Sequence, residues 1–166
     1  MKLSSAAILI MTISSLAHAS HPLIDSVAPE FTLLDQYNKP YDIRQDEGKM
    51  ILLLASDGQG SIQNKAWVDN INQRYNGKVP IIGIADVRKV PRPLKAFAKR
   101  EFKKSPVSVL LDWNGDVFIS YGLAENVANL ILIDKKGIVR YLYSGEATPE
   151  ACGMLFHIID HLTNDR

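Results

Sequence analysis

The stretch Asp57-Gly58-Gln59-Gly60-Ser61 has the composition of a ligand-binding loop. It follows a continuous apolar run and precedes a predicted helix, so free backbone N–H groups could hold an anion or a partner's carboxylate there. The alternative is a tight turn in which Ser61 caps the helix, which is a routine role for serine. Gln63 stands where a dinucleotide-binding loop needs its third glycine, and no phosphate-binding lysine follows. We therefore expect no cofactor at this loop or elsewhere.

The chain has one cysteine, Cys152, which excludes an internal disulfide and any multi-cysteine zinc or iron–sulfur site. Cys152 falls in the first turns of the predicted last helix. It could be a redox residue that pairs with the thiol of a partner protein, or a small buried hydrophobic residue. The buried residue is favoured, because the chain supplies no second thiol to resolve a mixed disulfide.

His157 and His161 are four residues apart, which places both on one face of the predicted last helix, with Asp160 beside them. Two imidazoles make an incomplete site, since metal sites usually need three or four ligands. His21 could bind copper near the expected mature N-terminus, but Pro22 removes the next backbone N–H from the possible ligands. We predict no metal site and keep copper or zinc carriage as an alternative.

Positive charge is concentrated between residues 88 and 104, where Glu101 is the only acidic residue. The basic residues of this segment are Arg88, Lys89, Arg92, Lys95, Lys99, Arg100, Lys103 and Lys104. They could dock an acidic protein or anionic lipid head groups, or they could form a solvated charged face. The predicted helix in this segment also has an apolar stripe that we expect to pack against the core: Leu94, Phe97, Ala98 and Phe102.

Composition limits the class of protein. The 166 residues include 19 basic and 18 acidic side chains, a formal net charge of +1. That balance argues against a dedicated nucleic-acid-binding protein, whose phosphate contacts need a clear cationic excess. The hydrophobic fraction of 46% is too high for a disordered chain.

The N-terminal segment is predicted to be a signal peptide. Lys2 gives a short positive region, residues 3–16 are mostly apolar, and Ala17-His18-Ala19 has the small-x-small pattern of a signal peptidase site. The apolar run is too short for a membrane span of about 20 residues, although an uncleaved anchor is the alternative. We predict cleavage after Ala19, a mature domain over residues 20–166 without a transmembrane segment, and a periplasmic location.

The remaining chain alternates predicted strands and helices, which is typical of an α/β fold with a mixed sheet covered on both faces. Two apolar runs, 50–55 and 80–85, suit strands buried on both faces. The other predicted elements are strands at 31–34, 41–43 and 107–111, helices at 62–75, around 94–102, at 116–122 and from 149 to about 162, and a hairpin joining 130–133 to 138–143. Thr148 is the expected N-cap of the last helix.

Three segments in this order resemble the thioredoxin-like fold, specifically its redoxin branch of peroxiredoxins and exported thiol–disulfide oxidoreductases. Residues 28–33 (APEFTL) resemble the APxFxL opening of that branch. Residues 111–117 (LDWNGDV), with Tyr121-Gly122 beyond, resemble its LxDxxGxV…YG segment, and residues 132–139 (LIDKKGIV) its LIDxxGxI hairpin. The resemblance implies a thioredoxin-like three-layer sandwich with a mixed central sheet. Segment by segment the chain looks closest to the small periplasmic YtfJ-like proteins.

The chemistry that this resemblance implies depends on a thiolate in the loop after the first central strand. The two cysteine positions of the branch fall near Gly58 and Ser61, and the loop contains no cysteine in any register. Serine forms no disulfide, and no nearby residue suggests a base that would activate it. The cis-proline position of the branch falls on Ala128, where a cis bond would cost about 2.5–4 kcal/mol. The sequence therefore predicts a redoxin scaffold without redoxin catalysis.

These observations lead to one main prediction and two alternatives. The main prediction is an exported, non-catalytic binding module that takes an envelope protein or a small ligand around residues 57–61 and 126–129, Ala128 included. The first alternative is a thiol–disulfide redox protein that acts through Cys152 with a partner. The second is a copper or zinc carrier.

Overall fold

The computed structural model describes residues 21–164, so the predicted signal peptide lies outside the described residues. Residues 21–164 form a mixed seven-stranded sheet in the order β2-β1-β5-β4-β3-β6-β7. The strands are β1 (Thr32–Asp35), β2 (Pro40–Asp42), β3 (Ile51–Ser56), β4 (Ile81–Asp86), β5 (Val109–Asp112), β6 (Asn129–Ile133) and β7 (Val139–Ser144). Strands β3, β4 and β5 run parallel, and the remaining pairings are antiparallel.

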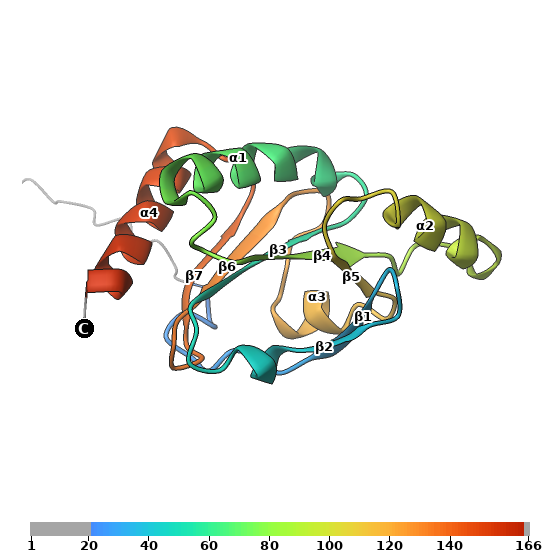
Figure 1. Ribbon diagram of the computed structural model, residues 1–166, viewed down its shortest axis with the longest axis horizontal. Helices are drawn as coiled ribbons and strands as arrows, with labels where there is room; N and C mark the ends of the chain where they lie inside the picture. The colour runs from blue at the N-terminus through green and yellow to red at the C-terminus, as the bar shows by residue number, and fades with distance from the viewer. Residues whose placement is uncertain (1–20, 165–166) are drawn as a thin grey trace, which may run out of the picture.

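Helices lie on both faces of this sheet (Figure 1). The α-helices are α1 (Asn64–Tyr75), α2 (Lys95–Phe102), α3 (Asp116–Ser120) and α4 (Pro149–Asn164). Three short 3-10 helices are η1 (Ile43–Asp46), η2 (Gly60–Gln63) and η3 (Arg92–Leu94). Helices α1 and α4 cover one face and α3 lies on the other, so the predicted three-layer α/β arrangement with a mixed sheet is confirmed.

The core has two parts because the central sheet is packed on both sides. On the side of α1 and α4, Trp67 and Ile71 pack with Leu155 and Ile159, and all four are almost completely buried. On the side of α3, the buried side chains include Phe31, Phe118 and Tyr121. Strand β3 lies between these clusters and is buried along its whole length, as its unbroken apolar run predicts.

A buried aspartate ends or follows each of five strands, and its carboxylate shapes the next turn. These residues are Asp35, Asp57, Asp86, Asp112 and Asp134. Asp112 accepts hydrogen bonds from the backbone N–H groups of Gly115, Asp116 and Val117, at 2.7–3.0 Å. Because a carboxylate can accept several such bonds, it satisfies the unpaired N–H groups at the start of α3.

The predicted hairpin and last helix are present. Strands β6 and β7 pair antiparallel around a turn in which Gly137 has a positive φ of 75°. Thr148 caps α4 as predicted, since its Oγ1 accepts the N–H of Ala151 at 3.2 Å. No helix within residues 21–164 is long and apolar enough to cross a membrane.

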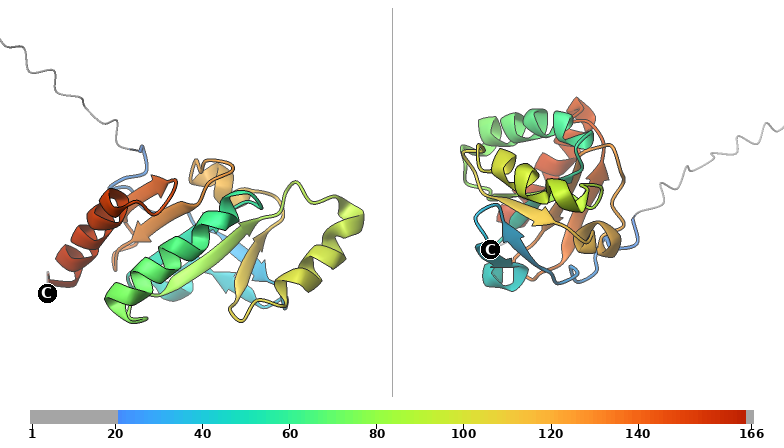
Figure 2. Two further views of the ribbon diagram at one scale, coloured as in Figure 1. Left: turned by 90° about the horizontal axis from the view of Figure 1, so that it is seen from above. Right: turned by 90° about the vertical axis from the view of Figure 1, so that its right-hand side faces the viewer.

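Helix α2 differs from its prediction. None of its residues is buried, and Leu94 and Phe97 are 52% and 54% exposed, so the expected packing of this apolar stripe against the core is wrong. The helix lies at one end of the molecule, away from the centre of the sheet (Figure 1). The view from above in Figure 2 shows β4 passing between α1 and α2. Strand β4 is accordingly only partly buried over Ile81–Gly83, although its apolar run predicts burial on both faces.

Candidate functional site

The loop after β3 is organised by Asp57. Its Oδ1 accepts the backbone N–H of Gly60 at 2.8 Å, and its Oδ2 accepts the N–H of Asn126 at 2.9 Å. Ser61 does not cap the helix as its type suggests; its hydroxyl donates instead to the carbonyl oxygen of Gly58 at 2.8 Å. The capping carboxylate therefore comes from the end of the strand, four residues before the serine.

The electrostatics of Asp57 favour its charged form. Burial raises the pKa of this carboxyl, but backbone hydrogen bonds from Gly60, Asn126 and Gln59 outweigh it, so the pKa lies below its usual value. Asp57 is thus a carboxylate at neutral pH, and each of its two oxygens accepts a backbone N–H of the protein. An anion would not bind beside this charge, so the loop lacks the character of an anion site.

Residues 57–63 are packed directly onto residues 126–128. A Cβ added to Gly60 would lie 2.2 Å from the carbonyl oxygen of Val127, so the two backbones touch at this point. Gln63 Oε1 accepts the N–H of Ala128 at 2.9 Å. Side chains of the loop therefore occupy the N–H groups of Asn126 and Ala128, which are unavailable to an incoming polypeptide.

Ala128 itself is fully buried in the core on the α1 side, and there is no cis peptide bond within residues 21–164. Its methyl group therefore faces the core and does not contribute to a binding surface. The structure brings Ala128 close to the Asp57–Ser61 loop, as the sequence predicts, but as a packing contact. The space that the sequence assigns to a groove between the two loops is closed by Gly60 and Gln63.

A cavity lies over β4 and reaches the loop after β3. It has a volume of about 620 Å³ and is mostly apolar. Its lining residues include Ile81, Gly83 and Ala85 of β4, Val68 of α1, Phe102 at the end of α2, and Val107 before β5. Gly83 leaves space over the strand because it has no side chain, and of α2 only its last residue, Phe102, lines the cavity. A Cβ at Gly83 would meet only the carbonyl oxygen of Ser108, at 4.0 Å.

One end of the cavity is polar and belongs to the loop after β3. Ser56, Asp57, Gly58, Ser61 and Asn64 line it. The Nδ2 of Asn64 donates to the Oγ of Ser56 at 2.8 Å, whereas Asn64 Oδ1 is buried and has no hydrogen-bond partner among the described residues. A buried acceptor without a donor costs free energy, and a ligand N–H or O–H at this place would remove that cost.

The remaining candidates do not join this site. Cys152 is 5% exposed in the core between the sheet and α4, does not line the cavity, and has its pKa raised by burial. The redox alternative needs an exposed thiol with a lowered pKa, whereas the thiol of Cys152 is buried and its pKa is raised. His157 and His161 lie exposed on α4, and His21 Nδ1 accepts the N–H of Leu23 at 3.3 Å. Within residues 21–164 no three His, Cys, Asp or Glu residues are grouped closely enough to hold a metal ion.

The basic residues of 88–104 fall into two groups. Arg88 and Lys89 stand beside the loop region, where Arg88 pairs with the buried Asp86 at 2.7 Å and Lys89 with Glu125 at 2.8 Å. The other six come from η3, α2 and the residues after α2: Arg92, Lys95, Lys99, Arg100, Lys103 and Lys104. The sequence predicts that all eight residues form one basic patch. In the structure Arg88 and Lys89 instead form ion pairs with acidic residues.

The mixed sheet, its two helical layers and the loop at the carboxyl end of β3 define a thioredoxin-like protein. The chain belongs to the Redoxin family, whose family model matches residues 24–154. It is 28% identical over 148 residues to chloroplastic peroxiredoxin Q of Triticum aestivum, an alignment that covers 82% of this chain and 66% of the relative. The chain thus spans just under two thirds of the length of that curated relative.

Solved structures that are similar in fold include two thioredoxin-like proteins. An exposed lipoprotein thioredoxin from Streptococcus pneumoniae is 20% identical with a TM-score of 0.61, covering 81% of this chain and 98% of that one. The thioredoxin domain of a thiol–disulfide oxidoreductase from Bacteroides vulgatus is 19% identical with a TM-score of 0.59, covering 82% and 97%. At such identities the likeness concerns the fold, while this chain has a single, buried cysteine.

Proposed function

We propose that this Redoxin-family chain is an exported, non-catalytic binding protein of the periplasm that holds a small, mainly apolar ligand in the cavity over β4. In this proposal residues 1–19 are a signal peptide removed after Ala19, residues 20–166 are the working domain, and the chain is akin to the YtfJ-like periplasmic proteins. The apolar run and the Ala17-His18-Ala19 pattern support export. The mass and N-terminal sequence of the chain recovered from a periplasmic fraction test it, and an uncleaved N-terminus would contradict it.

The absence of catalysis is supported by the loop after β3. It has no cysteine, and its neighbours at residues 126–128 are held by Asp57, Gly60 and Gln63. A thiol oxidoreductase needs both a thiolate and a free surface on which a substrate can lie. We expect insulin reduction and peroxide turnover to stay at background, with or without added thiols. Turnover that persists in a Cys152→Ala variant would overturn this part of the proposal.

The observation that carries the binding function is the uncovered face of β4. A central strand of an α/β sheet is normally covered by helices, and exposed apolar surface there costs free energy unless something binds. The cavity of about 620 Å³ lies in the size range of small-molecule sites, and its lining is apolar with a few polar groups at one end. Asn64 is one of these polar residues, and its buried Oδ1, which lacks a hydrogen-bond partner among the described residues, favours a ligand that has a donor.

A neutral fluorescent probe with one N–H donor, N-phenyl-1-naphthylamine, tests the site. We expect its fluorescence to rise on binding to the chain, and a Gly83→Leu variant to weaken that binding at least about tenfold, because the new side chain fills the cavity. Gly153→Leu is the matched control, since Gly153 is exposed on α4 with open space around it. Equal binding by the two variants would contradict the assignment of the cavity, provided that both give the same far-UV spectrum and unfolding midpoint as the parent.

A further inference from the structure

The end of the molecule that contains η3 and α2 is strongly cationic. Residues 88–104 contain eight basic side chains and one acidic side chain, a formal charge of +7, while the whole chain has +1. The rest of the chain therefore has −6, and the positive charge is segregated into this one segment. Such segregation orients a protein toward an anionic partner over distances of about a Debye length, which is about 8 Å at physiological salt.

Most of this charge has no acidic partner. Arg88 and Lys89 are paired as described above, and Lys104 pairs with Glu101 at 2.6 Å. The other five form no ion pair with any residue in 21–164, and we name them the α2 basic surface: Arg92, Lys95, Lys99, Arg100 and Lys103. Lys99 donates only to the amide oxygen of Asn38. Five cations close together repel one another, so an anionic partner would relieve an existing cost.

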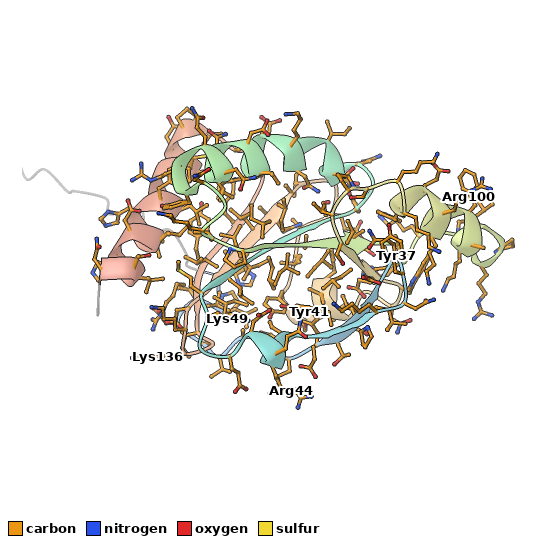
Figure 3. All side chains as sticks on the ribbon, in the orientation of Figure 1. Tyr37, Tyr41, Arg44, Lys49, Arg100 and Lys136 are labelled. Atoms are coloured by element: carbon orange, nitrogen blue, oxygen red, sulfur yellow. The ribbon has the colours of Figure 1, made fainter. Side chains whose placement is uncertain are left out.

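Apolar and aromatic side chains stand beside these cations. Leu94 and Phe97 are more than half exposed. The guanidinium of Arg100 lies over the Phe97 ring at 5.1 Å, and the ammonium of Lys103 lies over the Tyr37 ring at 5.7 Å. Figure 3 shows that Arg100 and Tyr37 both belong to the end of the molecule where α2 stands clear of the sheet. This end therefore presents apolar groups and positive charge together on a protruding helix.

We propose that the α2 basic surface docks the protein on an anionic phospholipid membrane. The cations would contact the head groups, and Leu94 and Phe97 would enter the boundary between head groups and acyl chains, where amphipathic helices with basic and aromatic side chains bind. A membrane satisfies both features at once, because it has an anionic layer directly above an apolar one. An acidic protein would need a charge array matched to five cations together with an apolar patch for Leu94 and Phe97. The inference is independent of the cavity over β4.

Vesicle co-sedimentation tests the inference on the processed chain, with residues 1–19 removed during export and the N-terminus verified. We expect binding to vesicles of phosphatidylcholine with 30% phosphatidylglycerol, no binding to pure phosphatidylcholine, and weakening with added salt. The variant Arg92→Gln/Arg100→Gln/Lys103→Gln should bind about 100-fold more weakly, since each cation near an anionic surface contributes about fivefold. These three side chains are exposed, so the fold should be unaffected.

The matched control is Lys78→Gln/Lys135→Gln/Lys136→Gln, which removes the same charge from exposed positions away from α2. It should bind within about threefold of the parent, and Phe97→Ser should bind more weakly than the parent at every salt concentration. An equal loss in both triple variants, or no binding to the anionic vesicles, would overturn the proposal. Retention on immobilised poly-glutamate without vesicle binding would assign the surface to an acidic protein instead. A Gly83→Leu chain should bind vesicles like the parent. A failure of the cavity proposal can therefore be distinguished from a failure of the membrane proposal.

Discussion

The carboxylate of Asp57 holds the backbone N–H of Asn126 at 2.9 Å, across 69 residues of sequence. Its other oxygen holds Gly60, so one buried side chain fixes both loops at the carboxyl end of β3. In a thioredoxin-like scaffold this is where chemistry is expected, and here the two oxygens of Asp57 join the two loops at this place. The cavity over β4 lies beside this junction, and Asp57, Gly58 and Ser61 are among its lining residues.

Replacing Asp57 by Asn should lower the free energy of unfolding by about 2 kcal/mol, because an amide offers one acceptor where the fold uses two. Urea denaturation followed by circular dichroism measures this change. Asp69→Asn is the control, since Asp69 is exposed in an ion pair with Lys65 and should change stability by less than about 0.5 kcal/mol. Equal effects of the two substitutions would show that the carboxylate does not hold the loops.

Gly60→Ala should destabilise the chain by about 1–3 kcal/mol, because the added Cβ would collide with backbone atoms of Val127 that have no rotamer to change. Gly58→Ala is the control in the same loop, since a Cβ there would meet nothing within 4 Å. Thermal unfolding of the two variants measures the difference. If both lose the same stability, the direct packing of the two loops is disproved.

Stability should fall at acid pH through the buried aspartates. The pKa values of Asp35, Asp57 and Asp134 are lowered, in each case because hydrogen bonds to the carboxylate outweigh the effect of burial. A group with a lowered folded pKa stabilises the fold above its unfolded pKa, about 3.9 for Asp, and this contribution disappears as the pH falls through the folded pKa. The free energy of unfolding should therefore be nearly constant from pH 7 to about pH 5 and decrease below about pH 4. The decrease should be shallower in Asp57→Asn, and an identical slope would exclude Asp57 as a contributor.

Local patterns in the sequence predict much of this fold. The run of apolar residues in β3, the turn that ends at Gly137 and the Thr148 cap each depend on a few neighbouring residues, and all three are present. Serine is a common N-cap, so the tight-turn alternative for the loop after β3 places Ser61 in that role, whereas in the structure Asp57 Oδ1 accepts the N–H of Gly60 and Oδ2 holds Asn126. An Asp at or directly after a strand end could have indicated it, since Asp112 ends β5, Asp134 directly follows β6, and both carboxylates accept backbone N–H groups of the next turn.

Contacts between segments that are far apart in the sequence could not be predicted. The periodicity of Leu94, Phe97 and Phe102 indicates a helix, but periodicity does not say which surface the apolar side meets, and none of these residues is buried. The cavity over β4 escapes prediction for the same reason. The apolar run of β4 predicts a strand buried on both faces, whereas Ile81 and Gly83 are only partly buried and line the cavity. The contacts of Asp57 with Asn126 and of Gln63 with Ala128 join residues more than sixty positions apart, and no local pattern encodes them.

Cys152 should be nearly inert in the folded chain. The thiolate is the reacting form of cysteine, and burial both raises the pKa of Cys152 and shields its sulfur from the reagent. At pH 8 alkylation by iodoacetamide should be at least about tenfold slower in buffer than in denaturant, where the side chain has an ordinary pKa. The reference for an exposed thiol is the variant Cys152→Ala/Met154→Cys, because Met154 is 62% exposed two residues further along the same helix. A native rate for Cys152 equal to that of this variant would restore the hypothesis of redox work through Cys152, since only an accessible thiolate can exchange with the disulfide of a partner protein.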